Sequence, residues 1–245
     1  MNQFTSGKVK TFFEEQDNYR DRKGMVHAEQ DPVILEFMAQ HADASSIVLE
    51  VGGGSGYMLD LVNLHVGPNR LYNCEIVPGT YRVQVNPAIT LVGGDCLQLP
   101  FRSGFCDFVI IKNVLHHLVG GTRKQSKGLA LQAVNELARV LRPGGHLIIV
   151  EQHHRHRLFA DIAFWITMLF AKVGVGVPSL GLNKNVIVSF LTPAEIESYV
   201  RGTGTNIVVS DHAKVEIPFI YRVTILLKDL GRSLIIGKVE GGNQS

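Results

Sequence analysis

A run of glycines that follows a short apolar segment is the first feature of the sequence that suggests chemistry. Residues 48–56 read VLEVGGGSG, in which Glu50 precedes glycines at Gly52, Gly54 and Gly56. Glycine lets the backbone turn with positive φ and removes the Cβ atoms that would block a ligand. A nucleotide-like ligand can then lie against this loop, at the carboxyl end of the strand before it.

The spacing of the glycines narrows the choice of ligand. The phosphate-loop pattern GxxxxGK[ST] is absent, and GxGxxG fails because its third glycine would fall on Tyr57 or Leu59. A dinucleotide rests its pyrophosphate on a helix N-terminus, whereas S-adenosylmethionine (SAM) has no phosphate and ends in an ammonium and a carboxylate. The pattern ExGxGxG therefore favours SAM, and it disfavours an NAD-dependent oxidoreductase.

Polar residues also follow the next three strand-like segments. A carboxylate at Glu75 can accept both hydroxyls of a ribose, and a short acid at Asp95 can accept from an adenine amino group. Asn113 stands where the methionine end of the cofactor should pass. The alternatives are a solvated glutamate, an Asx turn at Asp95 and a helix cap at Asn113. Each alternative is plausible for its own residue. The occurrence of a polar residue after each of three successive strands nevertheless favours a binding site.

An alternation of strands and helices must position these residues. Strands are expected at 47–51, 70–76, 89–92, 105–111, 146–150, 206–210 and 233–239. Helices are expected at 31–41, at 57–66, along the periodic apolar residues of 131–141, and after Thr192, where Pro193 suits the first turn. This alternation predicts a mostly parallel sheet that is covered on both faces.

Composition and charge exclude several classes of protein. With 245 residues, of which 45% are hydrophobic, the chain can bury one substantial core. The net charge of +2 predicts no large field for wrapping nucleic acid, so nucleic acid is not expected as a partner. Three scattered cysteines suit reduced thiols, and the sequence lacks a signal peptide and a transmembrane segment. We therefore expect a cytoplasmic protein.

Three stretches of the sequence resemble the class I SAM-dependent methyltransferases. They are VLEVGGGSG, then GDCLQLPF followed by CDFVIIKNVLHHL, and finally ELARVLRPGGHLIIVE, which together cover roughly residues 47–151. The likeness is greatest to the small-molecule branch that includes enzymes of ubiquinone and menaquinone biosynthesis. It implies an α/β fold: a Rossmann-like, doubly wound, mostly parallel seven-stranded sheet with helices on both faces, in a domain spanning 31–245.

The resemblance also implies a role for each residue of the predicted site. Gly52, Gly54 and Gly56 would form the cofactor loop, Glu50 would order that loop or the ammonium of SAM, Glu75 would hold the ribose, Asp95 and Cys96 the adenine, and Asn113 would lie near the methionine moiety. The expected activity is methyl transfer from SAM to an O, N or C atom. The alternative is a non-catalytic binding or regulatory subunit with the same fold, which the intact acids Glu50, Glu75 and Asp95 disfavour.

Histidines are the candidate general bases, because their pKa lies near neutrality. Five of them follow the fourth and fifth expected strands: His116, His117, His153, His154 and His156. We take His117 and His154 as the catalytic candidates, with a backbone-bridging role as the alternative for His117. The adjacent histidines lack the i,i+4 spacing of a helical zinc site, so no metal is expected.

The segment 158–173 is apolar on nearly all sides, and this property suggests what kind of acceptor the protein binds. A helix of this kind must be buried or must contact a partner or lipid. Placed after the fifth strand within an inserted cap at 153–190, it would form a lid together with a helical leader at 1–30, around Tyr19. A core helix, a homodimer contact and peripheral contact with a membrane are the alternatives. No NPPY or DPPY tetrad follows the fourth strand, so the expected acceptor is a small, apolar molecule rather than a base amine.

Overall fold

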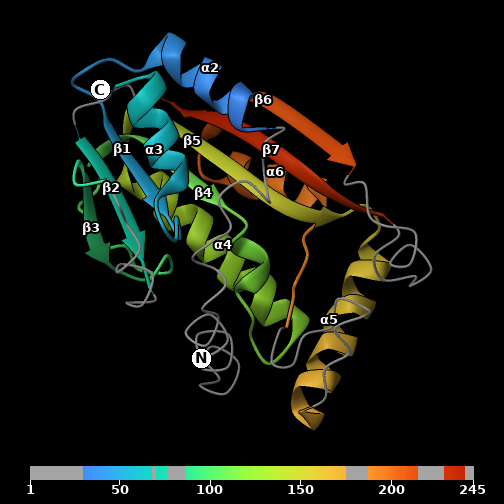
Figure 1. Ribbon diagram of the computed structural model, residues 1–245. Coiled ribbons are helices and arrows are strands. Elements are labelled where there is room, and N and C mark those ends of the chain that lie inside the picture. The colour runs from blue at the N-terminus through green and yellow to red at the C-terminus, as the bar shows by residue number, and fades with distance from the viewer. Residues whose placement is uncertain (1–29, 68–69, 77–85, 175–186, 215–228, 241–245) are drawn as a thin grey trace.

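The computed structural model describes residues 30–67, 70–76, 86–174, 187–214 and 229–240. Figure 1 shows one twisted sheet with helices on both of its faces. The described strands are β1 (Ile47–Val51), β2 (Arg70–Glu75), β3 (Ile89–Gly93), β4 (Cys106–Lys112), β5 (Leu141–His154), β6 (Thr205–Lys214) and β7 (Leu230–Val239). The described helices are α2 (Asp31–His41), α3 (Tyr57–His65), the 3₁₀ helix η3 (Leu115–His117), α4 (Arg123–Val140), α5 (Arg157–Val173) and α6 (Pro193–Gly202).

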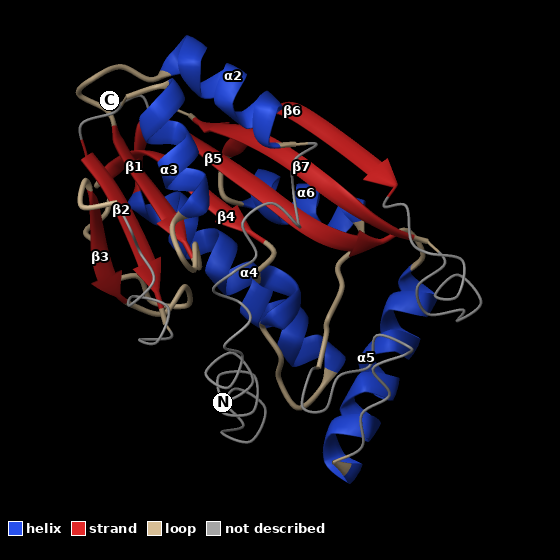
Figure 2. Cartoon of the chain, viewed as in Figure 1, coloured by secondary structure: helices blue, strands red, loops and turns tan. Residues whose placement is uncertain are grey.

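The strand order is β3-β2-β1-β4-β5-β7-β6, and it confirms the predicted Rossmann-like α/β fold. Strands β1 to β5 are parallel, while β7 runs antiparallel between β5 and β6. The chain reverses its direction of winding between β1 and β4, and in doubly wound sheets the ligand crevice lies at the carboxyl ends of the strands at such a point. Figure 2 shows the parallel strands pointing toward that edge.

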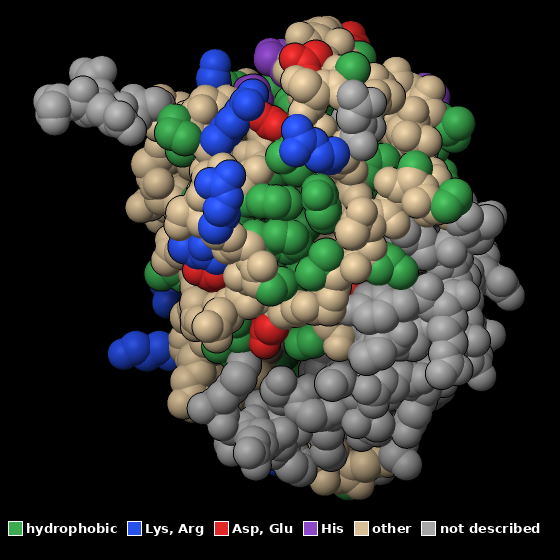
Figure 3. All heavy atoms as spheres, turned by 90° about the vertical axis from the view of Figure 1, so that its left-hand side faces the viewer, with side chains coloured by type: hydrophobic (Ala, Val, Ile, Leu, Met, Phe, Trp, Pro, Cys, Tyr) green, Lys and Arg blue, Asp and Glu red, His purple; other side chains and the backbone are tan. Residues whose placement is uncertain are grey.

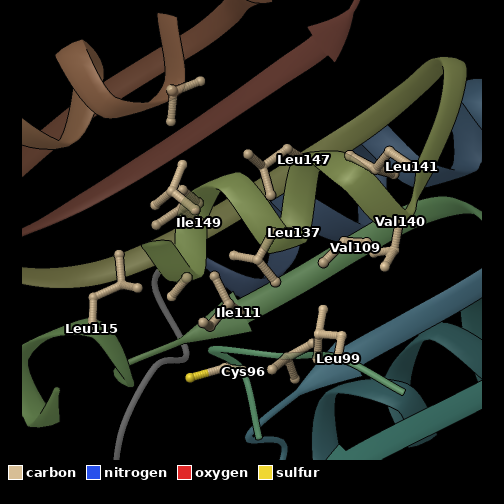
Figure 4. Close-up of a cluster of buried hydrophobic side chains, with 14 of the residues drawn as sticks. Cys96, Leu99, Val109, Ile111, Leu115, Leu137, Val140, Leu141, Leu147 and Ile149 are labelled. Carbon is tan, nitrogen blue, oxygen red and sulfur yellow. The ribbon is translucent and has the colours of Figure 1, made fainter. Parts of the chain in front are cut away.

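Two layers of apolar side chains bury the two faces of the sheet. Strand β4 contributes to both, because Phe108 and Ile110 pack among residues of α2 and α3, whereas Val109 and Ile111 pack toward α4 and α6. Figure 4 shows the second layer, in which Leu137 of α4 lies over the sheet. A parallel strand that is covered on both faces reads as a continuous apolar run, and this accounts for the sequence of β4.

Local sequence signals predict some of the ends of the helices and strands but not others. The helix predicted after Thr192 is present, and Thr192 and Glu195 form a reciprocal capping box at its start. The fifth strand, by contrast, is longer than the predicted 146–150. It continues to His154 because the antiparallel strand β7 pairs with it as far as Leu230. The histidines 153 and 154 therefore belong to the sheet and do not open the predicted insertion.

Helix α5 leaves the sheet where β5 ends. Figure 1 shows it extending away from the body of the molecule and not along either face of the sheet. Its Phe164, Met168 and Ala171 pack against Val119 and Ile187, in a small cluster of their own. Within the described ranges no helix is both long and apolar enough to cross a membrane. The predicted leader at 1–30, except for its last residue, and the stretch 175–186 lie outside the described residues.

Candidate cofactor and acceptor site

The glycine loop after β1 is built from three residues with positive φ. The φ angles of Gly52, Gly54 and Gly56 are 70°, 56° and 77°. A Cβ on Gly52 would lie 2.5 Å from Cγ2 of Val114, so this glycine lets the loop pack against the segment after β4. A Cβ on Gly54 would meet nothing within 4 Å, so it would project into open space beside the loop. The loop thus combines one glycine needed for packing with one that leaves room for a ligand.

Glu50 lies directly beneath this loop. Its side chain is buried, and a Cβ on Gly53 would lie 2.6 Å from its Oε2 atom. That Oε2 has no hydrogen-bond partner among the described residues. Burial raises the pKa of Glu50 to about 8, although Lys112 acts in the opposite direction. A buried carboxyl group with a free acceptor atom fits a ligand that carries an ammonium, because a cation favours the ionised carboxylate.

This raised pKa predicts how stability depends on pH. The carboxyl of Glu50 titrates at an ordinary value of 4.5 when unfolded and at about 8 when folded, so between these values the folded state holds the extra proton. The unfolding free energy should therefore fall as pH rises through this window, by up to about 1.4 kcal/mol per pH unit. His146 and His153, with pKa values lowered to about 4, raise stability with pH only up to their ordinary 6.5.

Urea unfolding without SAM, at about pH 7 and about pH 8, separates the two effects, because histidines with an ordinary pKa of 6.5 are already mostly neutral there and change stability little. Wild-type protein should lose stability over this interval, whereas Glu50→Gln should not. Parallel behaviour of the two proteins would contradict the raised pKa.

Lys112 joins Glu50 on the same face of the sheet, and the sequence did not single it out. Its Nζ donates a hydrogen bond to Oδ1 of Asp31 at the start of α2, and it lies 3.7 Å from Sδ of Met58. The side chain of Asp31 is buried, and that of Lys112 is 9% exposed. One cation and two acids therefore lie together beneath the loop, which suits a ligand end that carries both an ammonium and a carboxylate.

Glu75 ends β2 and holds the glycine loop in place. Its Oε2 accepts from the backbone N–H of Gly54 at 3.1 Å, and its Oε1 accepts from the N–H of Ile76 at 2.8 Å. Asn73 supports the same loop, because its Nδ2 donates to the carbonyl of Gly54 at 3.0 Å. The carboxylate of Glu75 is 7% exposed, which argues against the alternative of a solvated strand-end acid.

Replacing Glu75 with alanine should weaken SAM binding by roughly 10- to 150-fold. This range corresponds to the 1.5–3 kcal/mol typical of a hydrogen bond to a charged group. The variant loses both the proposed ribose acceptor and the bond to Gly54. Calorimetric titration with SAM measures the change, and Glu36→Ala, an exposed acid of α2, is the control. Equal affinities of wild type and Glu75→Ala would refute a role for this carboxylate.

Asp95 and Cys96 follow β3 at the same edge of the sheet. Oδ1 of Asp95 accepts from the N–H of Leu97 at 2.9 Å, so the Asx turn considered as an alternative is present in the structure. Cys96 is buried, and burial raises the pKa of its thiol above the ordinary value. The turn brings both residues beside the carboxyl end of β2, but their contact with an adenine stays a prediction.

Asn113 follows β4 with a φ of 55°, and it is the one non-glycine residue of the described ranges with positive φ. Its backbone N–H donates to the carbonyl of Val150 at 2.8 Å. Asparagine tolerates this conformation better than most residues. Such conformations cluster at functional sites, where the surroundings hold them. The conformation turns the chain sharply from β4 into η3, beside the glycine loop.

A buried pair between η3 and β5 was missed in the sequence. Glu151, 1% exposed, accepts from Nδ1 of His116, from the N–H of Leu115 at 2.6 Å and from the N–H of Gln152 at 2.8 Å. Because Nδ1 of His116 faces the carboxylate of Glu151, Nε2 is the ring nitrogen left to accept a proton in the neutral tautomer. The signal that could have found Glu151 is the one used for Glu75, because both are acids at the carboxyl end of a predicted strand.

The two predicted catalytic histidines occupy different environments. His117 is half-buried, its ring centre lies 4.0 Å from that of His116, and burial together with His116 lowers its pKa well below the ordinary value. His154 is fully buried, and its Nδ1 accepts from the backbone N–H of His156 at 3.2 Å. Both lie near the carboxyl edge, and their catalytic roles stay predictions. Among the described residues, no group of three or more His, Cys, Asp or Glu could hold a metal ion.

Arg123 ties helix α5 and the segment after it to the site. Its guanidinium donates to Asp161 of α5 at 2.8 Å, to Oγ of Ser189 and to the carbonyl of Phe190. The N–H of Ser189 in turn donates to the carbonyl of His116 at 2.8 Å. One buried arginine therefore links α4, α5 and residues 189–190 to the His116–Glu151 pair.

The strand order and this polar carboxyl edge define the class of the protein as a Rossmann-like methyltransferase fold. Residues 49–149 match the methyltransferase domain family. This match, over about two fifths of the chain, supports a SAM-dependent methyltransferase domain with SAM as its cofactor. The predicted position within the small-molecule branch is not confirmed by these comparisons.

Curated relatives share about half of this chain. The mouse (Mus musculus) tRNA (carboxymethyluridine(34)-5-O)-methyltransferase ALKBH8 is 32% identical over 132 residues, which are 51% of this chain and 18% of that protein. The Arabidopsis thaliana tRNA (carboxymethyluridine(34)-5-O)-methyltransferase is 29% identical over 119 residues, 48% of this chain and 26% of that protein. The chain thus spans about a quarter or less of the length of these relatives.

Solved structures show the same fold at low identity. A chain from the complex between the Haloferax volcanii Trm112 methyltransferase activator and a methyltransferase has a TM-score of 0.68 at 16% identity, and the match covers 98% of this chain and 100% of that one. Geranyl diphosphate methyltransferase has a TM-score of 0.60 at 10% identity, over 85% of this chain and 76% of that one. These likenesses establish the fold.

The prediction that nucleic acid is not a partner is wrong, because the curated relatives are named as tRNA methyltransferases. It depended on the net charge, which averages over the whole surface and does not report where charges gather. Figure 3 shows several lysine and arginine side chains, with acidic side chains among them, beside an apolar patch on the side of the molecule where β3 lies. The absence of an NPPY or DPPY tetrad disfavours only methylation of the amines of bases. It does not disfavour methylation of an oxygen, which is what the relatives' names describe.

Proposed function

We propose that the chain transfers the methyl group of SAM to an acceptor that reaches the carboxyl edge of the sheet between β4 and β5. The observation that carries this proposal is that the glycine loop follows β1 and that polar residues lie at the ends of β2, β3 and β4, all at one edge of the sheet. In this proposal Glu50, Gly52, Gly54, Gly56, Glu75, Asp95, Cys96 and Asn113 hold the cofactor. The buried, unpartnered Oε2 of Glu50 and the open space at Gly54 support it.

SAM supplies a methyl group already activated by its sulfonium, so the protein mainly has to orient the acceptor. Bringing two reactants together in line can contribute up to about 7–11 kcal/mol. The glycine loop and Glu75 position one side of the reaction. On the other side, His116 held by Glu151, together with His117 and His154, could take a proton from a hydroxyl acceptor. An acceptor that is already anionic needs no such base.

The first candidate acceptor is a modified nucleoside in tRNA. The curated relatives are named for methylating an oxygen of carboxymethyluridine in tRNA, and their likeness covers about half of this chain. The gathering of cations in Figure 3 provides a surface that could bind phosphate groups.

The second candidate is a small apolar acceptor, and it is favoured by helix α5. This helix lies beyond the matched residues 49–149, in the part of the chain that would differ between acceptors. In this version α5 and residues 187–190 cap the site, and Arg123 holds α5 and residues 189–190 close to His116. A non-catalytic SAM-binding subunit would keep the cofactor site and transfer nothing.

Methyl-labelled SAM tests these proposals directly. The protein is incubated with labelled SAM and either total tRNA or an organic extract of cells, with the Gly54→Val variant as a blank. Label in ribonuclease-sensitive material supports the tRNA acceptor, and label in organic-soluble material supports the apolar acceptor. Binding of SAM by calorimetry without transfer to either pool would overturn the enzymatic proposal in favour of a non-catalytic subunit. Failure to bind SAM would overturn the cofactor site itself.

A further inference from the structure

Helix α5 is apolar on two opposite faces, of which one is exposed. Leu158, Trp165, Leu169 and Val173 have exposed fractions of 67%, 52%, 59% and 67%. They are spaced by seven, four and four residues, so they fall on one face of a helix that turns by about 100° per residue. The opposite face is already occupied, because Phe164, Met168 and Ala171 are buried in the cluster with Val119 and Ile187.

The charges on and beside α5 are mostly cationic. Arg155 and Arg157 stand exposed at its start and Lys172 at its end, and none of them has an ion pair within the described part of the chain. The acid of the helix, Asp161, accepts from the buried guanidinium of Arg123 and is thereby neutralised. An exposed apolar face with unpaired cations at both ends has the chemistry of a helix that lies on an anionic lipid surface.

A second copy of the chain explains this face less well. A stable interface between proteins buries about 800 Å² on each partner. Fully burying even an aromatic side chain removes about 150–250 Å², and the four side chains here are already partly covered. Together they supply well under the required area. The cations at the two ends of the helix would also approach one another in an antiparallel pair.

We propose that α5 binds the surface of a membrane that contains anionic lipids, with Leu158, Trp165, Leu169 and Val173 inserted below the headgroups. Arg155, Arg157 and Lys172 then lie at headgroup level, where long basic side chains extend their charge toward the polar region. Tryptophan favours this boundary because its ring is apolar and its N–H is polar. Since α5 follows β5 at the carboxyl edge, this binding brings the methyltransferase site close to the bilayer.

The sequence offers a direct probe, because Trp165 is the single tryptophan of the chain. Its fluorescence is measured while vesicles of phosphatidylcholine and phosphatidylserine are added to the full chain. We expect the emission to shift to shorter wavelength, to be quenched by lipids brominated along their acyl chains, and to change less with phosphatidylcholine alone. Sedimentation with the vesicles should follow the same order.

Two charge-introducing variants make the test specific. Leu169→Glu keeps the tryptophan and should weaken vesicle binding by about tenfold or more, because it would place a charge where the proposal inserts a leucine below the headgroups. Leu64→Glu alters a leucine of α3 that is even more exposed than Leu169, and it should leave vesicle binding unchanged. Calorimetry with SAM should give the same affinity for both variants, so a failed membrane site is distinguished from a failed cofactor site.

Three outcomes would overturn the proposal. The first is an emission that does not respond to vesicles. The second is a shift that appears without vesicles, grows with protein concentration and accompanies a dimeric mass in solution, which would assign the face to a second copy. The third is equal vesicle binding by Leu169→Glu and wild type.

Discussion

Replacing Gly54 with valine should reduce the affinity for SAM by more than about a hundredfold, a loss of more than about 2.7 kcal/mol. The Cβ and methyl groups would enter the open space beside the loop, where nothing of the protein lies within 4 Å. Valine also resists the φ of 56°, because a β-branched side chain is strained in the left-handed region. Strain and occlusion therefore act together on the same residue.

A matched variant separates these two causes. Gly67, after α3, also has a positive φ, of 68°, and a Cβ there would also meet nothing within 4 Å. Gly67→Val should therefore cost similar backbone strain while leaving SAM affinity within about twofold of wild type. Calorimetry measures binding, and urea unfolding reports the strain in each variant. Normal SAM binding by a folded Gly54→Val protein would show that the loop is not the cofactor site.

Replacing Glu151 with alanine should lower the unfolding free energy by about 3–5 kcal/mol. The substitution removes the acceptor for the Nδ1–H of His116 and for two backbone N–H groups, those of Leu115 and Gln152. Each buried donor left without a partner costs about 1–3 kcal/mol, and few single substitutions exceed 4–5 kcal/mol. The same change frees His116 to rotate, so methyl transfer should fall as well.

Urea unfolding measures this loss, and Glu36→Ala is the control. Glu36 is an exposed acid of α2, and its replacement should change stability by less than about 0.5 kcal/mol. Glu151→Gln should be intermediate, since the amide oxygen still accepts one hydrogen bond but carries no charge. A loss below about 1 kcal/mol for Glu151→Ala would mean that water satisfies the three donors and that the pair with His116 does not hold η3 in place.

The arrangement of the cofactor edge could be predicted from the sequence because it depends on local signals. Apolar runs that end in glycines or acids predicted the strands, and parallel strands bring their carboxyl ends to one edge of the sheet. Glu75 and Asn113 accordingly lie beside the glycine loop, as the sequence indicated. The start of α6 could also be predicted from the local sequence, because Thr192 and Glu195 satisfy each other's backbone donors within one turn.

The pairs that complete the site could not be predicted in this way. Lys112 and Asp31 are 81 residues apart in the sequence, His116 and Glu151 are 35 apart, and Arg123 reaches Ser189 across 66 residues. Which of these side chains meet depends on the twist of the sheet, the register of its strands and the packing of helices on its faces. None of these features can be recognised from the residues that flank each partner in the sequence.

The sequence by itself therefore determined the class of fold, the glycine loop and the order of polar residues along one edge, because each rests on periodicity, turn geometry or strand direction. It predicted a helix at 158–173 but could not say which of its faces is buried, since both faces are apolar. It also ended β5 too early, because the extra residues are held by the antiparallel strand β7. Only the tertiary structure decided these points, as burial and strand pairing are set by contacts between distant segments of the chain.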